Sequence, residues 1–248
     1  MSESLVIDVP EDGLRVMTIA RPERRNALDR ATYGALRAAL AAFADDAAVR
    51  AVVLQGAGGD FTSGTDVADF RDVANAERPS AGVLFLKDLA RFPKPIVAAV
   101  EGHAIGIGTT LLLHCDLAYA GRGARFRLPF VALGLCPEGA SSYLLPRLAG
   151  AKRAAELLML GDRFDADVAE RVGLVNAITD EGGAFPQALV QARRLAALPA
   201  AALVATKRLL MRSTAMAVAE SIDEEAQLFQ TLRRSPEAQQ AFAAFLMR

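Results

Sequence analysis

The strongest constraint on how this chain can fold is an order of features that occurs twice: an apolar run, a loop with glycines, and a helical stretch. The first run is 51–55, followed by GAGGDFTSGTD, and the second is IVAAV, followed by EGHAIGIG. Short apolar runs bounded by turn signals are typical of buried strands, and glycines let a backbone approach a ligand closely. A helical pattern at 81–91 separates the two copies. This alternation of strands and helices predicts an α/β fold.

The flanking segments extend the same pattern. LVIDV and LRVMTIA surround the turn signal PEDG and predict an N-terminal hairpin, and DLAYA predicts a further strand. From Thr32 onward, apolar residues at helical spacing predict a helix, with Asp29 in the N-cap position. Beyond Pro186 the pattern is helical, without a strand signal. We therefore expect a core over 1–195 and a C-terminal helical region over 196–248.

The composition excludes several classes of function. With 248 residues, 52% of them hydrophobic, the chain can bury a substantial core. Its 28 basic and 29 acidic residues are interspersed, so the basic patch of a nucleic-acid-binding protein is missing. No segment resembles a signal peptide or the roughly 20 apolar residues of a membrane span. Two cysteines in such a chain favour a reducing compartment, and we expect a cytoplasmic protein with neither nucleic-acid nor membrane partners.

The glycine loops do not match nucleotide-binding motifs. GHAIGIGTTL has Gly106 and Gly108, but Leu111 stands where the dinucleotide fingerprint requires a third glycine, and no P-loop pattern occurs. No G-x-S-x-G elbow surrounds the serines at 141 and 142, which disfavours a serine hydrolase. The residues with metal-ligating side chains have spacings that fit no familiar site, so we expect no metal: His103, His114, Cys115 and Cys136.

Two glycine loops that each follow a strand can instead direct two backbone N–H groups at one oxygen, as an oxyanion hole does. The N–H of Ile107, at the start of the helix after AIG, would gain from the positive end of the helix dipole. The N–H of Ser63 in FTSGTD would supply the second donor. On periodicity alone, two tight turns without a catalytic role are the simpler explanation.

One acid, Glu138, stands in the otherwise apolar stretch LPFVALGLCPEGASSYLLPRLAG. Two interpretations fit its position. Acids favour the first turn of a helix, and Pro137 could lead into a helix here. Alternatively, a carboxyl in apolar surroundings is partly desolvated, which raises its pKa and suits general acid/base catalysis. The residues alone leave both interpretations open.

Taken together, these segments resemble the crotonase, or enoyl-CoA hydratase/isomerase, family over nearly the whole chain. RPERRNALD is similar to the N-terminal signature of the family, and FTSGTD is similar to its first oxyanion loop. The family's second loop, helix and strand are similar to EGHAIGIGTTLLLHCDLAYAGRGARF, and the segment before its last helices is similar to ADVAERVGLVN. The resemblance implies a spiral of ββα units and a C-terminal helical region used in trimer contacts. It also implies an acyl-CoA thioester substrate, whose carbonyl occupies the oxyanion hole.

The resemblance also points to one branch of that family. Hydratases have two glutamates, at positions that are Thr110 and Phe130 here, so the usual hydration looks impossible. CPEGASSY is similar to the SPEGxSSY segment of peroxisomal-type Δ3,Δ2-enoyl-CoA isomerases, which makes Glu138 the implied proton shuttle. One carboxylate suffices for that reaction, because it can remove a proton at C2 and return it at C4 of the same dienolate.

Coenzyme A is then part of the substrate, and we expect no separate cofactor. The implied contacts are the main chain of Ser63, Gly64, Thr65, Asp66 and Val67, and the side chain of Arg25, which we favour over Arg24. Phe229 and Arg248 match family positions that line the same site, although helix packing and a solvated terminus explain them equally well. We expect a homotrimer or a dimer of trimers. The alternatives are another crotonase-type reaction, namely hydration or a ring-opening isomerisation, and a non-catalytic acyl-CoA-binding protein.

Overall fold

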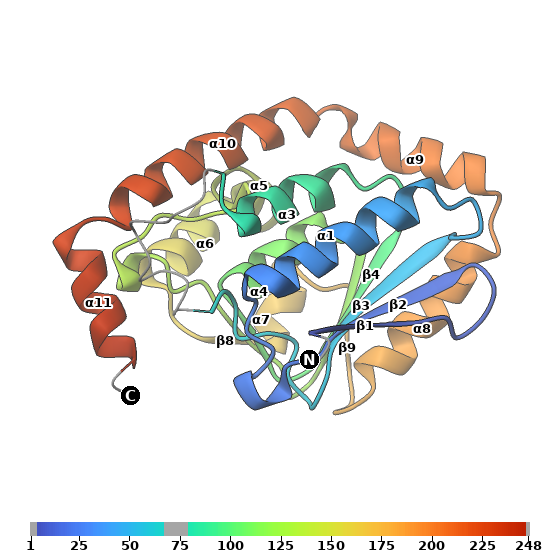
Figure 1. Ribbon diagram of the computed structural model, residues 1–248, viewed down its shortest axis with the longest axis horizontal. Helices are drawn as coiled ribbons and strands as arrows, with labels where there is room; N and C mark the ends of the chain where they lie inside the picture. Colours follow the sequence, from blue (N-terminus) through green and yellow to red (C-terminus); the bar gives the residue numbers. More distant parts are fainter. Residues whose placement is uncertain (1–3, 67–78, 247–248) are drawn as a thin grey trace.

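A six-stranded sheet forms the centre of the computed structural model, which describes residues 4–66 and 79–246 (Figure 1). Val67 and Arg248 lie outside the described residues. The strands stand in the order β1-β2-β3-β4-β6-β9, and only the β1–β2 pair is antiparallel. Their bounds are β1 (Leu5–Asp8), β2 (Leu14–Ile19), β3 (Ala51–Gly56), β4 (Ile96–Val100), β6 (Leu117–Gly121) and β9 (Ala177–Thr179). The predicted hairpin, the predicted buried strands and the α/β class are therefore confirmed.

A second sheet has three short strands in the order β5-β7-β8: β5 (His103–Ile105), β7 (Arg125–Arg127) and β8 (Phe164–Asp165). Sequence patterns do not predict these three strands, because runs of two or three residues show no measurable periodicity. Strand β5 matters for the site, since it lies inside the second glycine loop.

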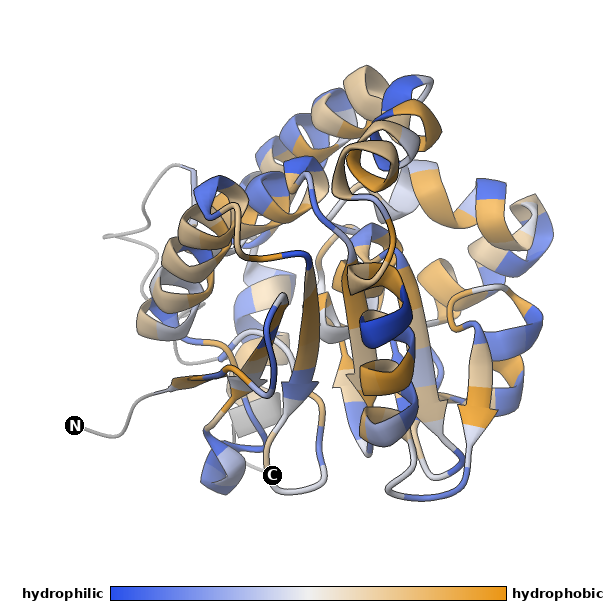
Figure 2. Cartoon of the chain, turned by 90° about the vertical axis from the view of Figure 1, so that its right-hand side faces the viewer, coloured by the Kyte–Doolittle hydropathy of each residue, from blue (hydrophilic) through white to orange (hydrophobic). Residues whose placement is uncertain are grey.

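The two faces of the central sheet are covered by different helices. Alternation along β3 sends Val52 and Leu54 into the core beneath α1 (Arg30–Asp45) and α3 (Ala81–Arg91). Ala51 and Val53 face α8 (Ala184–Ala196), whose alanines pack on the sheet. Most residues of the sheet strands are accordingly hydrophobic, as the colouring in Figure 2 shows. Helix α1 begins as predicted, because the Asp29 carboxylate accepts a hydrogen bond from the Thr32 N–H at 2.8 Å.

All but one of the remaining helical elements before α8 follow the second glycine loop. Between β5 and α8 they are α4 (Ile107–Thr110), η2 (Leu111–His114), η3 (Val131–Leu133), α5 (Ser141–Ala149), α6 (Ala151–Ala155), the π-helical turn η4 (Glu156–Leu160) and α7 (Ala166–Arg171). A short 3-10 turn, η1 (Pro22–Arg24), precedes α1.

The C-terminal part is helical, as the sequence predicts: α9 (Ala200–Arg212), α10 (Ala215–Leu232) and α11 (Pro236–Leu246). Helices α9 and α10 form an arc over the body of the molecule, and α11 turns back at one end (Figure 1). Helix α10 contacts α3 and α5, and α11 contacts η3. The division into units at 195 stays a prediction.

No single helix in the described ranges is both long and apolar enough to cross a membrane. Helices α8 and α9 meet those criteria only as a pair, across a bend of 111°.

Candidate active site

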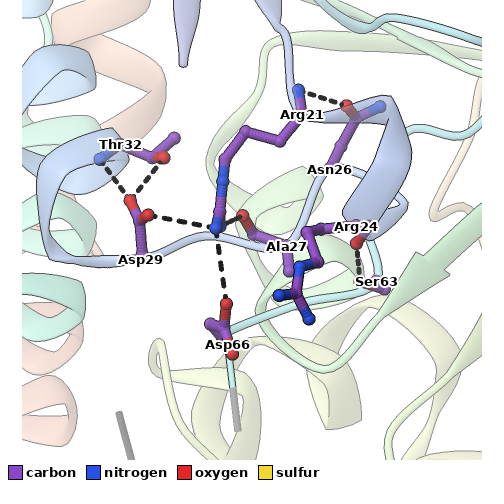
Figure 3. Close-up of polar contacts among 8 residues, drawn as sticks. All are labelled: Arg21, Arg24, Asn26, Ala27, Asp29, Thr32, Ser63 and Asp66. Atoms are coloured by element: carbon purple, nitrogen blue, oxygen red, sulfur yellow. Dashed lines mark hydrogen bonds and ion pairs between the residues drawn. The ribbon is translucent and has the colours of Figure 1, made fainter. Parts of the chain in front are cut away.

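The segment that precedes α1 holds the first glycine loop in place (Figure 3). The Arg21 guanidinium pairs with Asp29 at 3.2 Å and with Asp66 at 3.5 Å, and it donates to the Ala27 carbonyl. The buried Asn26 amide nitrogen donates to the carbonyls of Ala57 and Asp60 at 2.7 and 2.6 Å. RPERRNALD therefore serves as a scaffold for the loop, a role that its sequence did not suggest.

The first loop lies between two other backbone segments and gives up almost all of its amide hydrogens to them. Its N–H groups donate as follows: Phe61 to Glu101 O, Thr62 to His103 O, Ser63 to Arg25 O, Gly64 to Thr62 Oγ1, and Asp66 to Leu28 O. Within the described residues, the N–H of Thr65 has no acceptor. Buried amides are paired in most structures, so an unpaired N–H in such a loop is a donor available to a ligand.

This arrangement corrects the prediction for the first loop. The Ser63 N–H is bound to the Arg25 carbonyl at 2.9 Å and has no hydrogen to offer an oxyanion. Thr65 forms a parallel bridge with Leu28 in which the flanking residues make the hydrogen bonds, so its own N–H points away from Leu28. The Thr65 hydroxyl lies 2.6 Å from the Tyr33 hydroxyl on α1, which fixes its side chain.

The second loop places Ile107 at the first position of α4. Gly106, at φ 57°, turns the chain from β5 into that helix. The N–H of a first helical residue has no acceptor within its helix, and none is found for Ile107 elsewhere in the described chain. The helix is shorter than expected, because a 3-10 turn follows Thr110. Because α4 has only 4 residues, its dipole strengthens hydrogen bonding by the Ile107 N–H less than the dipole of a longer helix would.

The two loops touch directly. Thr62 forms a parallel bridge with Ala104, and its N–H donates to the His103 carbonyl at 2.8 Å. A Cβ atom on Gly64 would lie 2.6 Å from the Ile105 carbonyl oxygen, and one on Gly108 would lie 2.6 Å from Thr62 Cγ2. These glycines are needed because a side chain would separate the loops.

Glu138 does not cap a helix. Helix α5 begins at Ser141, its N-cap is Ala140, and no side chain of that cap bonds to the helix. Gly139 and Ala140 both adopt left-handed conformations, at φ 69° and 56°, and form a turn between Glu138 and α5. The helix-cap interpretation of Glu138 is therefore wrong.

The Glu138 carboxyl lies in the interior, although the residue as a whole is only half-buried. Burial, together with the nearby Glu225 carboxylate, raises the pKa of Glu138 to about 8. No hydrogen-bond or ion-pair partner for its carboxyl occurs among residues 4–66 and 79–246. A carboxyl near its pKa at neutral pH can both accept and return a proton.

The elements after Ile107 hold the Glu138 segment against the second loop. A Cβ atom on Gly139 would lie 3.3 Å from Thr110 Oγ1, on α4. His114 Nε2 donates to the Gly139 carbonyl at 2.7 Å. Burial lowers the pKa of His114 to about 4, so this imidazole is neutral at physiological pH. The acid and the Ile107 amide therefore belong to one packed unit.

The other predicted binding residues have different settings. Arg25 is exposed at φ 49°, beside the first loop. The Asp66 carboxylate pairs with Arg21. Phe229 is 9% exposed and packs in the main hydrophobic core. Their contacts with coenzyme A stay predictions. In the described part of the chain, no cluster of three or more His, Cys, Asp or Glu side chains could hold a metal ion.

A family model described as enoyl-CoA hydratase/isomerase matches residues 10–248. The chain belongs to this crotonase family. The 1,2-epoxyphenylacetyl-CoA isomerase of Escherichia coli K12 is 31% identical over 95% of this chain and 93% of that protein. The 2,3-dehydroadipyl-CoA hydratase of the same organism is 32% identical over 94% and 92%. Human enoyl-CoA delta isomerase 2 is 32% identical over 99% of this chain but 64% of its own length.

Solved structures show the same fold. Pseudomonas aeruginosa OdaA is 44% identical, with a TM-score of 0.95 and 100% of both chains covered. An enoyl-CoA hydratase/isomerase from Pseudoalteromonas atlantica T6c is 37% identical, with a TM-score of 0.92 over 98% and 97% of the two chains. Because the relatives include hydratases and isomerases, membership of the family does not select the reaction.

In this crotonase, the two positions that resemble the hydratase acids hold Thr110 and Phe130, which are 0% and 4% exposed. Neither can transfer a proton as a carboxyl does. Glu138 is thus the acid that adjoins the second loop. Two supporting residues, His114 and Glu225, were not assigned roles from the sequence, since their contacts join segments 25 and 85 positions apart.

Replacing Gly108 with alanine should destabilise the protein by about 1–3 kcal/mol, because the new Cβ would overlap Thr62 at the contact between the two loops. Urea unfolding followed by circular dichroism measures this. Gly34→Ala is the control, since nothing lies within 4 Å of that Cβ position on α1. That change should be neutral or stabilising by up to about 1 kcal/mol. Equal stability of both variants would contradict the close approach.

Glu138 should make stability fall as pH rises. Its folded pKa of about 8 exceeds the ordinary 4.5, so between these values the folded state retains a proton that the unfolded state has lost. The free energy of unfolding then decreases over this interval. Melting temperatures of wild type and Glu138→Gln, taken at about pH 5 and about pH 9, test this. The variant should lose less stability than wild type over this pH interval. Parallel pH dependences would contradict the prediction.

Proposed function

We propose that this crotonase isomerises 3-enoyl-CoA to 2-enoyl-CoA, with Glu138 as the only proton-transferring side chain. The observation that carries the proposal is a carboxyl with a pKa of about 8, in a segment that packs against α4, the helix whose first residue, Ile107, has an unpaired amide. This combination supports a reaction in which one group takes and returns one proton.

The thioester carbonyl would accept hydrogen bonds from the N–H groups of Thr65 and Ile107. Developing negative charge on that oxygen strengthens both bonds, and each such donor is worth roughly 3–4 kcal/mol in other enzymes. The Glu138 carboxylate removes a proton from C2, the electron pair moves into a dienolate, and the neutral acid returns the proton to C4. The double bond then lies between C2 and C3, conjugated with the thioester.

Coenzyme A would enter as part of the substrate, without a separate cofactor. The proposed contacts are the main chain from Ser63 through Gly64, Thr65 and Asp66 to Val67, and the exposed Arg25 side chain beside the phosphates. The Phe229 side chain, on α10, is a further proposed contact with coenzyme A. We propose a cytoplasmic homotrimer, or a dimer of trimers, as the working form.

A ring-opening isomerisation is the second candidate, favoured by the 31% identity to the E. coli 1,2-epoxyphenylacetyl-CoA isomerase over nearly both chains. It would use the same carbonyl-binding amides on a different acyl group. A non-catalytic acyl-CoA-binding protein is the third, but it has no use for a desolvated acid at Glu138.

Purified protein mixed with a 3-enoyl-CoA should produce the ultraviolet absorbance of the conjugated thioester. Glu138→Gln should lose at least about 10²-fold in kcat, since the amide cannot accept the proton. Glu224→Gln, an exposed glutamate on α10, is the matched control and should retain wild-type activity. Equal turnover by Glu138→Gln would remove this acid from the mechanism, and no turnover by wild type would reject the proposed substrate.

Crotonyl-CoA should be hydrated slowly or not at all, because Thr110 and Phe130 offer no second acid to activate water. Loss of the conjugated absorbance in the absence of any 3-enoyl-CoA measures hydration. Rapid hydration would mean that Glu138 and a water molecule suffice, and the enzyme would then be a hydratase.

A further inference from the structure

The Glu225 carboxylate lies beside the proposed catalytic acid and comes from a different part of the chain. Its residue is on α10 and is only 5% exposed. Its oxygens accept hydrogen bonds from the Ala140 N–H at 2.6 Å, the Ser142 N–H at 3.0 Å and the Ser142 hydroxyl at 2.5 Å. A charged group buried in this way requires such donors, and here the donors are at the start of α5.

Helix α5 lacks a cap from its own sequence, because its N-cap residue is Ala140. Glu225 replaces that cap from α10, and a negative charge at a helix N-terminus is favourable. The same bond holds Ala140 in its left-handed conformation, which is unfavourable for a residue with a Cβ atom. Gly139 alone separates this bonded amide from Glu138.

The turn that carries Glu138 is therefore held at two points: His114 binds the Gly139 carbonyl, and Glu225 binds the Ala140 N–H. We propose that Glu225 is a positioning residue for the acid, because it fixes this turn and places a second negative charge beside Glu138. Under the proposed function, that charge keeps Glu138 able to act as an acid after it has acted as a base.

Two titratable groups next to this pair, His114 and Cys136, do not change charge near neutral pH. Burial lowers the pKa of His114 to about 4 and raises that of Cys136 to about 11, where the Glu225 and Glu138 carboxylates add to the effect. Glu224 is exposed on α10. Burial also raises the pKa of Glu225, whereas its bonds to Ser142 and Ala140 lower it. With three donors aimed at it, the ionised form of Glu225 is the one that this geometry accommodates.

A titration that needs no substrate tests the proposal. In protein labelled with ¹³C at the glutamate carboxyl carbons, the Glu138 signal is identified by its loss in Glu138→Gln. Glu225→Gln keeps the size of the side chain and removes its charge, so the Glu138 midpoint should fall from about 8 toward ordinary carboxyl values. Glu224→Gln removes an exposed charge from the same helix and should leave that midpoint in place.

Kinetics provide the second readout. Glu225→Gln should lower kcat by at least about 10-fold with little change in KM, because small displacements of a reacting group cost up to about 10²-fold. If that variant folds poorly, Ser142→Ala replaces it. Loss of the hydroxyl donor raises the pKa of Glu225, which reduces the charge beside Glu138 and again lowers the Glu138 midpoint.

An unchanged Glu138 midpoint in both variants would overturn the proposal, even if kcat fell, since a purely structural role predicts that result. Only the kinetic measurement rests on the proposed function, because it requires turnover of a 3-enoyl-CoA. Should wild type fail to isomerise 3-enoyl-CoA, the proposed function would fall, while the titration would still decide whether Glu225 controls Glu138.

Discussion

The site depends on how the loop from Phe61 to Asp66 is held between two other backbone segments, 25–28 and 101–103. On one side it bonds to the carbonyls of Arg25 and Leu28, and on the other to those of Glu101 and His103. Because each amide from Phe61 to Asp66 except that of Thr65 has a fixed partner, the loop has a defined conformation although it is neither helix nor regular strand. The one unpaired donor of this half-buried loop is therefore at Thr65, where a ligand can accept its hydrogen bond.

The acid is held by a different means. Glu138 has no partner of its own among the described residues, so its position comes from the backbone turn that follows it. Two side chains, the half-buried His114 on η2 and the buried Glu225 on α10, bind that turn. Burying two carboxylates close together is unfavourable for folding, and the structure compensates for Glu225 with donors while leaving Glu138 uncompensated. Strain and unpaired charge of this kind are expected where a group must react.

Local patterns predicted most of the scaffold. The hairpin, the long strands, the Asp29 cap and the C-terminal helices followed from periodicity and turn chemistry, and apolar surroundings identified Glu138. The donor in the first loop could not be assigned this way, since Ser63 and Thr65 occupy the same short motif and only the bond from Ser63 to Arg25 distinguishes them. Glu225 was equally inaccessible, because its partner lies 85 positions away and helix periodicity marks it only as a residue on α10.

The way in which the first loop presents the amide at position 65 affects how such a protein can diversify. The amide at position 65 is presented by the path of the main chain, which neighbouring carbonyls determine, while the threonine hydroxyl is turned toward Tyr33. Changes in either side chain would alter the surroundings of this amide and leave the amide itself in place. Under the proposed function, in which this amide binds the thioester carbonyl, descendants of this chain could acquire new acyl preferences through single substitutions without rebuilding the framework.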